Sequence, residues 1–315
     1  MRSRTPILLD CDTGIDDAVA LLYLLSQPEV EVVGITTVFG NTTAAIAARN
    51  TRKVLEIAGR TDIPIAVGAD KPLVGEVGHL ATHVHGTDGL GGYGDARSSE
   101  PPPGASARGA EEFISSLARA HPGELHILAT AAQTNLAQAV AADPDLAGRV
   151  ARVTAMGGAI EVPGNVTPFA EANIFHDPEA AQRVFSAAWP IDLVPLDATL
   201  RERLTDRHRA RLAEAGSPAA AFVAAITDHY FDFYAGGSTA ERSAPCHDPL
   251  AAAIALGTVV PSRSVDLHVS VDCTDGERRG ATVATPGLAN CRAVLRTGGD
   301  LGDLLVARLT AGTAG

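Results

Sequence analysis

Basic residues are scarce in this chain. It has 25 Lys and Arg against 37 Asp and Glu, which gives a formal net charge of −12. Proteins that bind nucleic acids need basic patches against the phosphate backbone. The densest basic run, "RERLTDRHRARL" at 201–212, is interrupted by acids and is typical of a solvated helix face. The sequence therefore argues against a nucleic-acid partner.

Cysteine and long apolar runs are also scarce. The four cysteines, Cys11, Cys246, Cys273 and Cys291, form neither a CxxC pair nor a dense framework. This usage is typical of a reducing compartment. No uninterrupted apolar run approaches the ~18 residues of a membrane helix, and the N-terminal apolar stretch is too short for a signal peptide. We expect a soluble, cytoplasmic protein without a membrane partner.

Segments with strand and helix patterns alternate along the first two thirds of the chain. The length of 315 residues suits one large α/β domain or two smaller ones, and 46% hydrophobic residues suffice for a sizeable core. We predict an α/β fold with an open, mostly parallel, Rossmann-like sheet flanked by helices. The active site is expected at the C-terminal ends of the strands. The expected strands are 6–10, 30–38, 63–68, 124–130, 152–158 and 190–196, and the helices between them are 16–27, 42–59, 110–121 and 134–143.

The rest of the chain breaks this rhythm. A long loop region is expected over 71–110, since glycine, proline and three histidines gather there. From 201 to 256 the chain reads as mainly helical. Three strand-like segments and a helix from about residue 300 follow. Because no linker clearly separates two parts, we expect a single domain over 1–315.

Four carboxylates follow the first expected strand within eight residues, in "DCDTGIDD". Asp10 and Asp12 share one face of the strand end, and Asp16 and Asp17 begin a helix whose positive dipole end favours anions. Like charges this close repel one another unless a cation lies among them. Oxygen ligands favour Ca²⁺ or Mg²⁺ over zinc. The alternative is helix capping in a solvated acidic turn.

This opening resembles the DxDxxxDD signature of the nucleoside hydrolases, the inosine-uridine preferring N-ribohydrolase family. Four later segments also resemble family motifs, in the family's order: "VFGNTT" with Asn41, "VHGTDGLGG" with His85, "MGGAIEVPGNVTPFAEANIFHDPEAA", and "HDPLA" at 247–251. The resemblance covers residues 7 to about 251. It implies a calcium-dependent enzyme that hydrolyses the N-glycosidic bond of ribonucleosides and releases ribose and a free nucleobase.

The resemblance also implies a metal site. It assigns Ca²⁺ to Asp12, Asp17, the backbone carbonyl of Thr130 and Asp248, with Asp12 as general base. Asp10 would lie behind the cluster and orient it. The alternative for Asp248 is the N-cap of a helix that begins "PLAAAIAL". Both roles are compatible, because the second oxygen of a cap can still reach a metal.

The implied ribose-binding residues come from several loops. Amides and carboxylates suit vicinal hydroxyls, which need both donors and acceptors. A lone loop asparagine is more often a turn residue, and a lone methionine is more often core filling than a sugar contact. The residues assigned to the sugar are Asp16, Asn41, Met156, Asn165, Glu171 and Asn173.

Histidines are the candidates for assisting the departing base. His247 and His85 can donate near neutral pH, and His247 precedes a proposed metal ligand. Trp189 looks like a core residue, which favours the histidine-assisted branch of the family over purine stacking. The helix containing "DHYFDFYAGG" could supply the wall of the base pocket through His229, Tyr230, Phe233 and Tyr234, and a packed core face is the alternative for Phe231 and Phe233.

Two departures from family patterns stand out. Where the family has Gly-Pro-Leu-Thr-Asn, this chain has "AAQTN" at 131–135, which retains Asn135 and puts the backbone shape at Thr130 in question. The segment "HLATHVHGTD" faintly resembles a zinc motif, but the spacing of His79, His83 and the following Asp does not fit it.

Other classes of function remain open at this level. A haloacid-dehalogenase-type phosphatase also opens with strand-DxD, but it needs a downstream lysine and a late acidic pair that have no convincing placement. A nucleoside-binding protein on the same fold, without turnover, is compatible with every motif. A nicotinamide-dependent oxidoreductase lacks its GxGxxG after the first strand. The family resemblance implies a homodimer or homotetramer.

Overall fold

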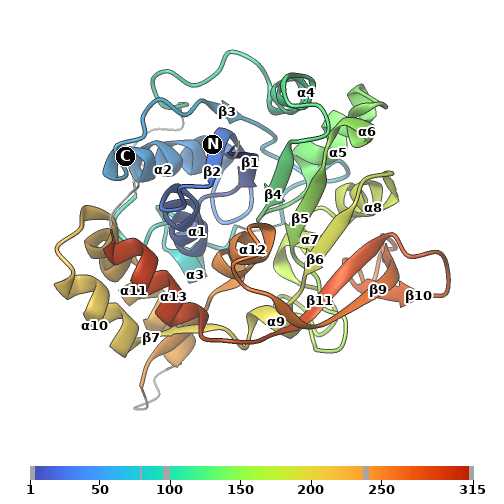
Figure 1. Cartoon of the computed structure of the whole chain (residues 1–315). Coiled ribbons are helices and arrows are strands. Elements are labelled where there is room, and N and C mark those ends of the chain that lie inside the picture. Colours follow the sequence, from blue (N-terminus) through green and yellow to red (C-terminus); the bar gives the residue numbers. More distant parts are fainter. Residues whose placement is uncertain (1–3, 79, 95–99, 237–240, 312–315) are drawn as a thin grey trace.

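A nine-stranded sheet runs through the whole molecule (Figure 1). The computed structural model describes residues 4–78, 80–94, 100–236 and 241–311, so the proposed zinc-motif residue His79 lies outside the described residues. The strands of this sheet are β1 (Thr5–Cys11), β2 (Val30–Thr37), β3 (Ile65–Val67), β4 (His126–Ala129), β5 (Arg152–Met156), β6 (Ile191–Val194), β9 (Pro261–Val271), β10 (Thr282–Thr285) and β11 (Cys291–Thr297).

The strand order is β10-β9-β11-β6-β5-β4-β1-β2-β3. All pairs from β3 to β11 are parallel, and only β9 and β10 join antiparallel. The order reverses between β1 and β4, which is the topological switch point where open α/β sheets bind their ligands. The predicted open, mostly parallel, Rossmann-like sheet is confirmed.

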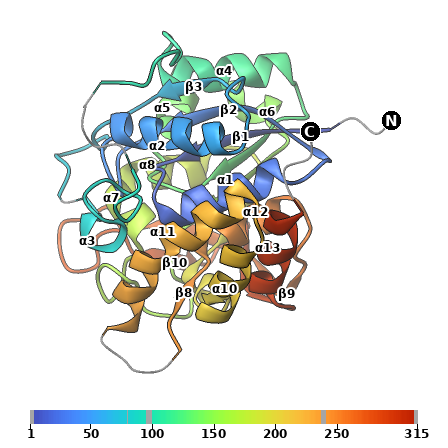
Figure 2. The same ribbon diagram turned by 90° about the vertical axis from the view of Figure 1, so that its left-hand side faces the viewer.

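Helices cover both faces of the sheet, as Figures 1 and 2 show. The helices α1 (Ile15–Leu25) and α12 (His247–Ala255) lie on one face, with α2 (Ala44–Ile57) beside α1. The helices α4 (Ala110–Ala120), α5 (Thr134–Ala142) and α8 (Pro178–Ser186) lie on the other. A further layer of α10 (Asp206–Glu214), α11 (Pro218–Ala235) and α13 (Leu301–Thr310) packs outside α1. The short helices are α3 (Thr82–His85), α6 (Leu146–Arg149), α7 (Ala172–His176) and α9 (Leu196–Thr199).

The first strand shows why these residues form a central strand. Ile7 and Leu9 belong to the apolar core on the side of α1 and α12, and Leu8 belongs to the core on the side of α4 and α5. Because side chains alternate across a strand, a strand covered on both faces is apolar at every position. Asp10 interrupts this run at the carboxyl end of β1, fully buried.

A buried carboxylate fixes the long segment after β3. Asp177 caps α8 by accepting from the Ala180 amide at 3.0 Å, and its other oxygen accepts from the Leu73 amide and the Thr134 hydroxyl, both at 2.8 Å. One side chain thereby ties the loop, α5 and α8 together. The predicted loop region is therefore ordered over its described part, and it contains the short helix α3.

The prediction of a mainly helical stretch over 201–256 is incomplete. It holds α10, α11 and α12, but also a small antiparallel pair, β7 (Arg203–Thr205) and β8 (Ser243–Pro245). The basic run at 201–212 is accordingly part strand and part helix, and His208 and Leu212 within it are buried. Trp189 is a core residue, as expected. Among the described residues, no helix is long and apolar enough to cross a membrane.

Close packing of α4 on β2 gives a test of this arrangement. A Cβ added at Gly34 would lie 2.6 Å from Cε1 of Phe113 and 2.9 Å from Cδ1 of Leu117. We expect Gly34→Ala to lower the free energy of unfolding by about 1–3 kcal/mol through overpacking, measured by urea denaturation. Gly148→Ala in α6, where a Cβ meets nothing within 4 Å, is the matched control. Equal stability of the two variants would contradict the packing of α4 against β2.

Candidate functional site

A cavity of about 190 Å³ opens beyond the carboxyl ends of the central strands. Its lining brings together residues from α1, the loop after β2, α3, the loops after β4 and β5, α7, α11 and α12. The predicted site residues in that lining are Asp16, Asn41, His85, Thr130, Met156, Asn165, Glu171, Asn173, Tyr230, Tyr234, His247 and Asp248. This is the position that the switch-point rule gives for a ligand.

A larger, more open groove of about 860 Å³ lies elsewhere, between the start of β6 and the β9–β11 region. Its buried carboxylate, Asp192, is paired with Arg152 at 2.7 Å and Arg292 at 2.6 Å. The two arginines balance the negative charge of Asp192, so this carboxylate has a structural role. The smaller cavity holds the carboxylates that have no such partner, and we therefore place the functional site there.

Asp16 and Asp248 line the cavity, and Asp12 and Asp17, which are outside the lining, are buried next to them; these four carboxylates are called the floor below. Asp12, Asp16, Asp17 and Asp248 are each at most 7% exposed. One oxygen of each of Asp16, Asp17 and Asp248 lies within 4.8 Å of the others. The structure thus brings together residues from the two ends of the expected motif set, more than 200 positions apart in the sequence.

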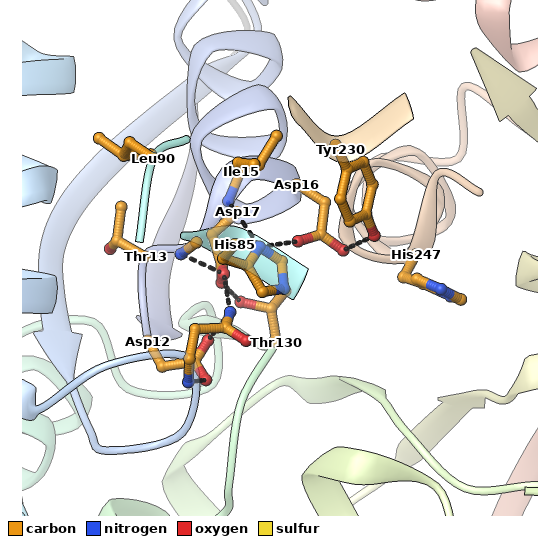
Figure 3. A network of polar contacts seen from close by, with 12 residues as sticks. Asp12, Thr13, Ile15, Asp16, Asp17, His85, Leu90, Thr130, Tyr230 and His247 are labelled. Carbon is orange, nitrogen blue, oxygen red and sulfur yellow. Dashed lines mark hydrogen bonds and ion pairs between the residues drawn. The ribbon is translucent and has the colours of Figure 1, made fainter. Parts of the chain in front are cut away.

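Hydrogen bonds orient two of these carboxylates. The backbone amide and the side-chain amide of Asn41 donate to Asp12, at 2.7 and 2.9 Å. Asp17 accepts from the Gly14 amide at 2.9 Å, at the start of α1, and from the Thr130 hydroxyl at 2.7 Å. Figure 3 shows Asp12, Asp17 and Thr130 grouped in this way below His85.

Burial and mutual repulsion destabilise the charged forms of these groups. Burial is the main cause that raises the pKa of Asp12 and Asp248 well above the usual range, and the neighbouring carboxylates raise it further. The same two causes raise the pKa of Asp16 to about 7. The nearest histidine does not neutralise them, because burial lowers the pKa of His85 to about 3 and keeps it uncharged.

This floor fits a hard divalent cation. All its donors are oxygens, which is the ligand chemistry of Ca²⁺ and Mg²⁺. The measured grouping contains Asp16, Asp17 and Asp248, whereas the resemblance implied Asp12 together with Asp17 and Asp248. The Thr130 carbonyl faces the same region, since it accepts from Nδ2 of Asn173 at 3.0 Å. Hydrogen bonds leave the net negative charge in place, and a cation would balance it.

Asp248 does not cap its helix. Cys246 occupies the N-cap position of α12, and Asp248 lies within the first turn, followed by Pro249. The N-cap interpretation is therefore wrong, because the helix begins two residues earlier than its proline suggested. The first turn of α12 still places the carboxylate where the positive end of the helix dipole favours it.

Asp10 lies behind the floor, as expected. Its Oδ1 accepts from the Thr36 hydroxyl at 2.5 Å and from Nδ2 of Asn135 at 2.8 Å. Burial raises its pKa to about 7. Asn135, the residue retained from the family's turn, also donates to the Thr37 carbonyl at 3.0 Å. The departure at 131–135 thus keeps the contact that joins α5 to β1 and β2.

The expected sugar-binding residues also hold the backbone of the site. Glu171 is the N-cap of α7, and it accepts from the amides of Asn173 and Ile174 and from the Gly158 amide, at 2.9, 3.2 and 2.9 Å. Asn165 accepts from the Ala172 amide at 3.0 Å. Asn165 and Glu171 therefore have structural roles in the loop, whether or not they also bind the sugar. Burial nonetheless raises the pKa of Glu171 to about 7, despite those donors.

Met156 also meets one of these residues directly. Nδ2 of Asn173 lies 3.2 Å from Sδ of Met156 and donates to the Met156 carbonyl at 3.3 Å. Met156 is 2% exposed and lies at the end of β5. It therefore packs into the core cluster, as the core-filling alternative held, and it also borders the cavity, where its contact with the sugar stays a prediction.

Histidines and tyrosines form the opposite wall. Tyr230 donates from its hydroxyl to Asp16 at 3.3 Å and stacks on His85, with ring centroids 5.4 Å apart. Nδ1 of His85 accepts from the Ile15 amide at 3.1 Å, which leaves the proton of this neutral ring on Nε2. Figure 3 shows Asp16 between His85 and Tyr230.

His247 completes this wall. Its Nε2 lies 3.3 Å from the Tyr234 hydroxyl, and its Nδ1 lies 2.8 Å from the Thr199 hydroxyl. Burial, assisted by the positive charge of Arg203, lowers the pKa of His247 to about 4. The Arg203 guanidinium carbon also lies 6.0 Å from the centre of the Tyr234 ring. Thr199 and Arg203 belong to no motif, so sequence analysis had no signal by which to find them.

Two expectations for α11 need revision. His229 is outside the cavity lining and packs against Gly91 instead. Phe231 is fully buried, as the core-face alternative held, but Phe233 is 41% exposed and borders the cavity. His83, considered above only for a zinc motif, also lines the cavity, and the lining residues that sequence analysis did not single out are Ala81, Val84, Val166, Ala172, Phe175 and His176.

A second group with metal-ligand chemistry lies outside the cavity, at His208, Asp300 and Asp303. Nδ1 of His208 accepts from the Thr205 amide at 3.2 Å, so the neutral ring carries its proton on Nε2, the atom that faces the two carboxylates. A nitrogen that bears a proton has no lone pair for a metal. We therefore interpret this group as a link between α10 and α13.

Comparison with known proteins identifies the chain's family. The family model described as inosine-uridine preferring nucleoside hydrolase matches residues 7–300. A probable uridine nucleosidase 2 of Arabidopsis thaliana is 40% identical over 233 residues, covering 73% of this chain and 71% of the relative. The pyrimidine-specific ribonucleoside hydrolase RihA of Citrobacter koseri is 36% identical over 278 residues, covering 88% and 87%.

Solved structures agree. A plant nucleoside hydrolase superposes with a TM-score of 0.88 at 30% identity, covering 98% of this chain and 99% of that one. This chain belongs to the nucleoside hydrolase family. It is a hydrolase that acts on the N-glycosyl bonds of ribonucleosides, which confirms the resemblance and sets aside the phosphatase and oxidoreductase alternatives.

Proposed function

We propose that this nucleoside hydrolase carries out calcium-dependent hydrolysis of the N-glycosidic bond of ribonucleosides, with uridine as a preferred substrate. The observation that carries the proposal is that one cavity holds an uncompensated carboxylate floor, amide and carboxylate groups suited to ribose, and two neutral histidines. The relatives described as uridine nucleosidase and pyrimidine-specific hydrolase support the choice of uridine.

The floor would supply the attacking water. Asp12, Asp17, Asp248 and the Thr130 carbonyl would hold Ca²⁺, with Asp16 beside them. When bound, the cation would lower the pKa of a water molecule. Asp12 would accept a proton from that water as general base, while Asn41 fixes the direction of its oxygens.

The side chains around the floor would bind the sugar. Hydrolysis passes through an oxocarbenium-like ribosyl cation, so negative charge beneath the ring would stabilise the transition state. Asn165, Glu171 and Asn173 line the cavity on one side, and Asp16 and Asn41 line it next to the floor. Met156 would pack against the apolar part of the ribose.

The wall of histidines and tyrosines would assist the departing base. His247 and His85 are neutral, so each would donate a hydrogen bond from Nε2–H as negative charge develops on the base. Tyr230 and Tyr234 border the same space from α11. Donors aimed at developing charge in a buried site are effective because they need no reorganisation during the reaction.

Several wider properties remain proposals from the sequence. We propose that residues 1–315 act as a single domain, because one sheet connects β1 with β11. A cytoplasmic location and a homodimer or homotetramer are likewise proposed from the cysteine usage and the family resemblance. Sedimentation velocity of the purified protein measures the oligomeric state directly.

Removal of the cation tests the proposed cofactor. Treatment with a chelator is expected to abolish ribose release from uridine, and added Ca²⁺ to restore it. Because a ligand that binds only the folded state stabilises it by about 2.7 kcal/mol at 100 times its Kd, the melting temperature should rise with Ca²⁺ as well. Undiminished turnover in protein that elemental analysis shows to be metal-free would contradict the proposal. Calcium binding without release from any ribonucleoside would favour a nucleoside-binding protein.

Substitution of Asp12 tests the general base. We expect Asp12→Ala and the closer isostere Asp12→Asn to lower kcat for uridine by at least about 100-fold, because general base catalysis contributes roughly 10²–10⁴. Circular dichroism controls for folding. Activity above a few per cent of the wild type in Asp12→Asn would show that another group takes the proton.

Substitution of His247 tests the leaving-group role. His247→Ala should lower kcat for uridine by about 100-fold. It should leave 4-nitrophenyl β-D-ribofuranoside nearly unaffected, because nitrophenolate departs without a hydrogen-bond donor. Both rates are measured on the same preparation. Equal losses on the two substrates would remove His247 from the leaving-group step.

A further inference from the structure

The side chain of Thr199 contacts the His247 ring at Nδ1. Its hydroxyl lies 2.8 Å from Nδ1, on the side of the ring opposite the Tyr234 hydroxyl, which lies 3.3 Å from Nε2. Thr199 is fully buried and is outside the cavity lining, so it cannot touch a substrate. It is the last residue of α9, a helix of a single turn.

The direction of the Thr199–His247 hydrogen bond and the tautomer of the ring are linked. A threonine hydroxyl has one hydrogen, and a neutral imidazole has one N–H and one free lone pair. Within the described residues, the contact with His247 is the one hydrogen bond of the Thr199 hydroxyl. The hydroxyl can donate that hydrogen to Nδ1 only when the ring carries its own proton on Nε2, the nitrogen that faces Tyr234 and the cavity, whereas in the other tautomer the hydroxyl accepts from Nδ1–H.

The helix that carries Thr199 is firmly anchored. The Leu196 amide donates to the Gly158 carbonyl at 2.9 Å. The Asp197 carboxylate accepts from the amides of Ile160 and Glu161 at 2.9 and 2.7 Å. The Gly158 amide in turn donates to Glu171. α9 thus belongs to the same rigid network as the residues proposed to hold the ribose.

We propose that Thr199 is a positioning residue for the departure of the base: it holds His247 with the proton on Nε2, aimed into the cavity. This inference rests on the leaving-group role proposed for His247. No covalent step is involved, because Thr199 donates a hydrogen bond to Nδ1 and thereby keeps Nε2–H available as a donor. Without Thr199, the ring can rotate or exchange tautomers and present a lone pair to the base.

The test compares two substrates in Thr199→Val, which keeps the side-chain shape and removes the hydroxyl. We expect kcat for uridine to fall by roughly tenfold, a part of the 10²–10⁴ of general acid–base assistance, with KM little changed. The rate with 4-nitrophenyl β-D-ribofuranoside should change by less than about threefold, because that leaving group needs no donor. Thr199→Ser retains the hydroxyl and should recover most of the uridine activity.

Thr154→Val is the matched control. Thr154 is also fully buried, and its hydroxyl lies 2.9 Å from Nε2 of another buried histidine, His126, away from the cavity. This variant loses the same kind of contact and should affect the two substrates equally. In ¹⁵N spectra of the histidine side chains, assigned with His247→Gln, the wild type should show His247 protonated at Nε2, and Thr199→Val should lose that single tautomer.

Different outcomes distinguish the proposals. Equal loss on both substrates in Thr199→Val, or an unchanged His247 tautomer, would overturn the positioning role. So would full uridine activity in Thr199→Val while His247→Ala shows its selective loss. If His247→Ala itself shows no selectivity between the substrates, the leaving-group role fails first, and the proposal for Thr199 falls with it.

Discussion

The concentration of buried carboxylates at the end of β1 is the constraint on which the rest of the site depends. Asp12, Asp16, Asp17 and Asp248 cannot all be charged in a dry pocket unless positive charge is brought to them. The fold supplies part of it through the start of α1 and the first turn of α12, whose helix dipoles point their positive ends at the cluster. A divalent cation would supply the remainder, and the oxygen-only donor set matches that need.

The topology of the sheet explains why these groups meet. Asp12 follows β1 and Thr130 follows β4, the two strands between which the order reverses. Helices leave a parallel sheet in opposite directions at that point, so the crevice there stays open. This much could be predicted from the sequence, because an apolar run directly precedes "DCDTG" and the alternation of strands and helices is regular. The contribution of Asp248 came only through the resemblance, since no local pattern relates it to Asp12.

Other parts of the site could not be predicted from the sequence, because the exact position of residues along the helices was not known. In α11, Tyr230, Phe233 and Tyr234 are spaced by three and four residues and share the face that borders the cavity, whereas His229 is rotated away by one position onto Gly91. An error of one residue in assigning the face of a helix therefore replaces a residue that lines the cavity with one that does not. Similarly, the start of α12 could not be placed from its proline, and β7 and β8 were too short to give a periodic signal.

The carboxylate floor is negatively charged, whereas the histidine wall carries no net charge. This difference depends on keeping the histidines neutral. A charged His85, 3.9 Å from Asp16, would form an ion pair with the floor and compete with a cation. Burial prevents this by lowering the pKa of His85 to about 3 and of His247 to about 4. The rings then offer N–H groups without net charge, which in the proposed mechanism would stabilise an electron-rich departing base. Their usefulness therefore depends on which nitrogen bears the proton. For His85 that choice is made by the Ile15 amide, and for His247 we propose that the Thr199 hydroxyl makes it, so the neutral wall needs supports as well placed as those of the anionic floor.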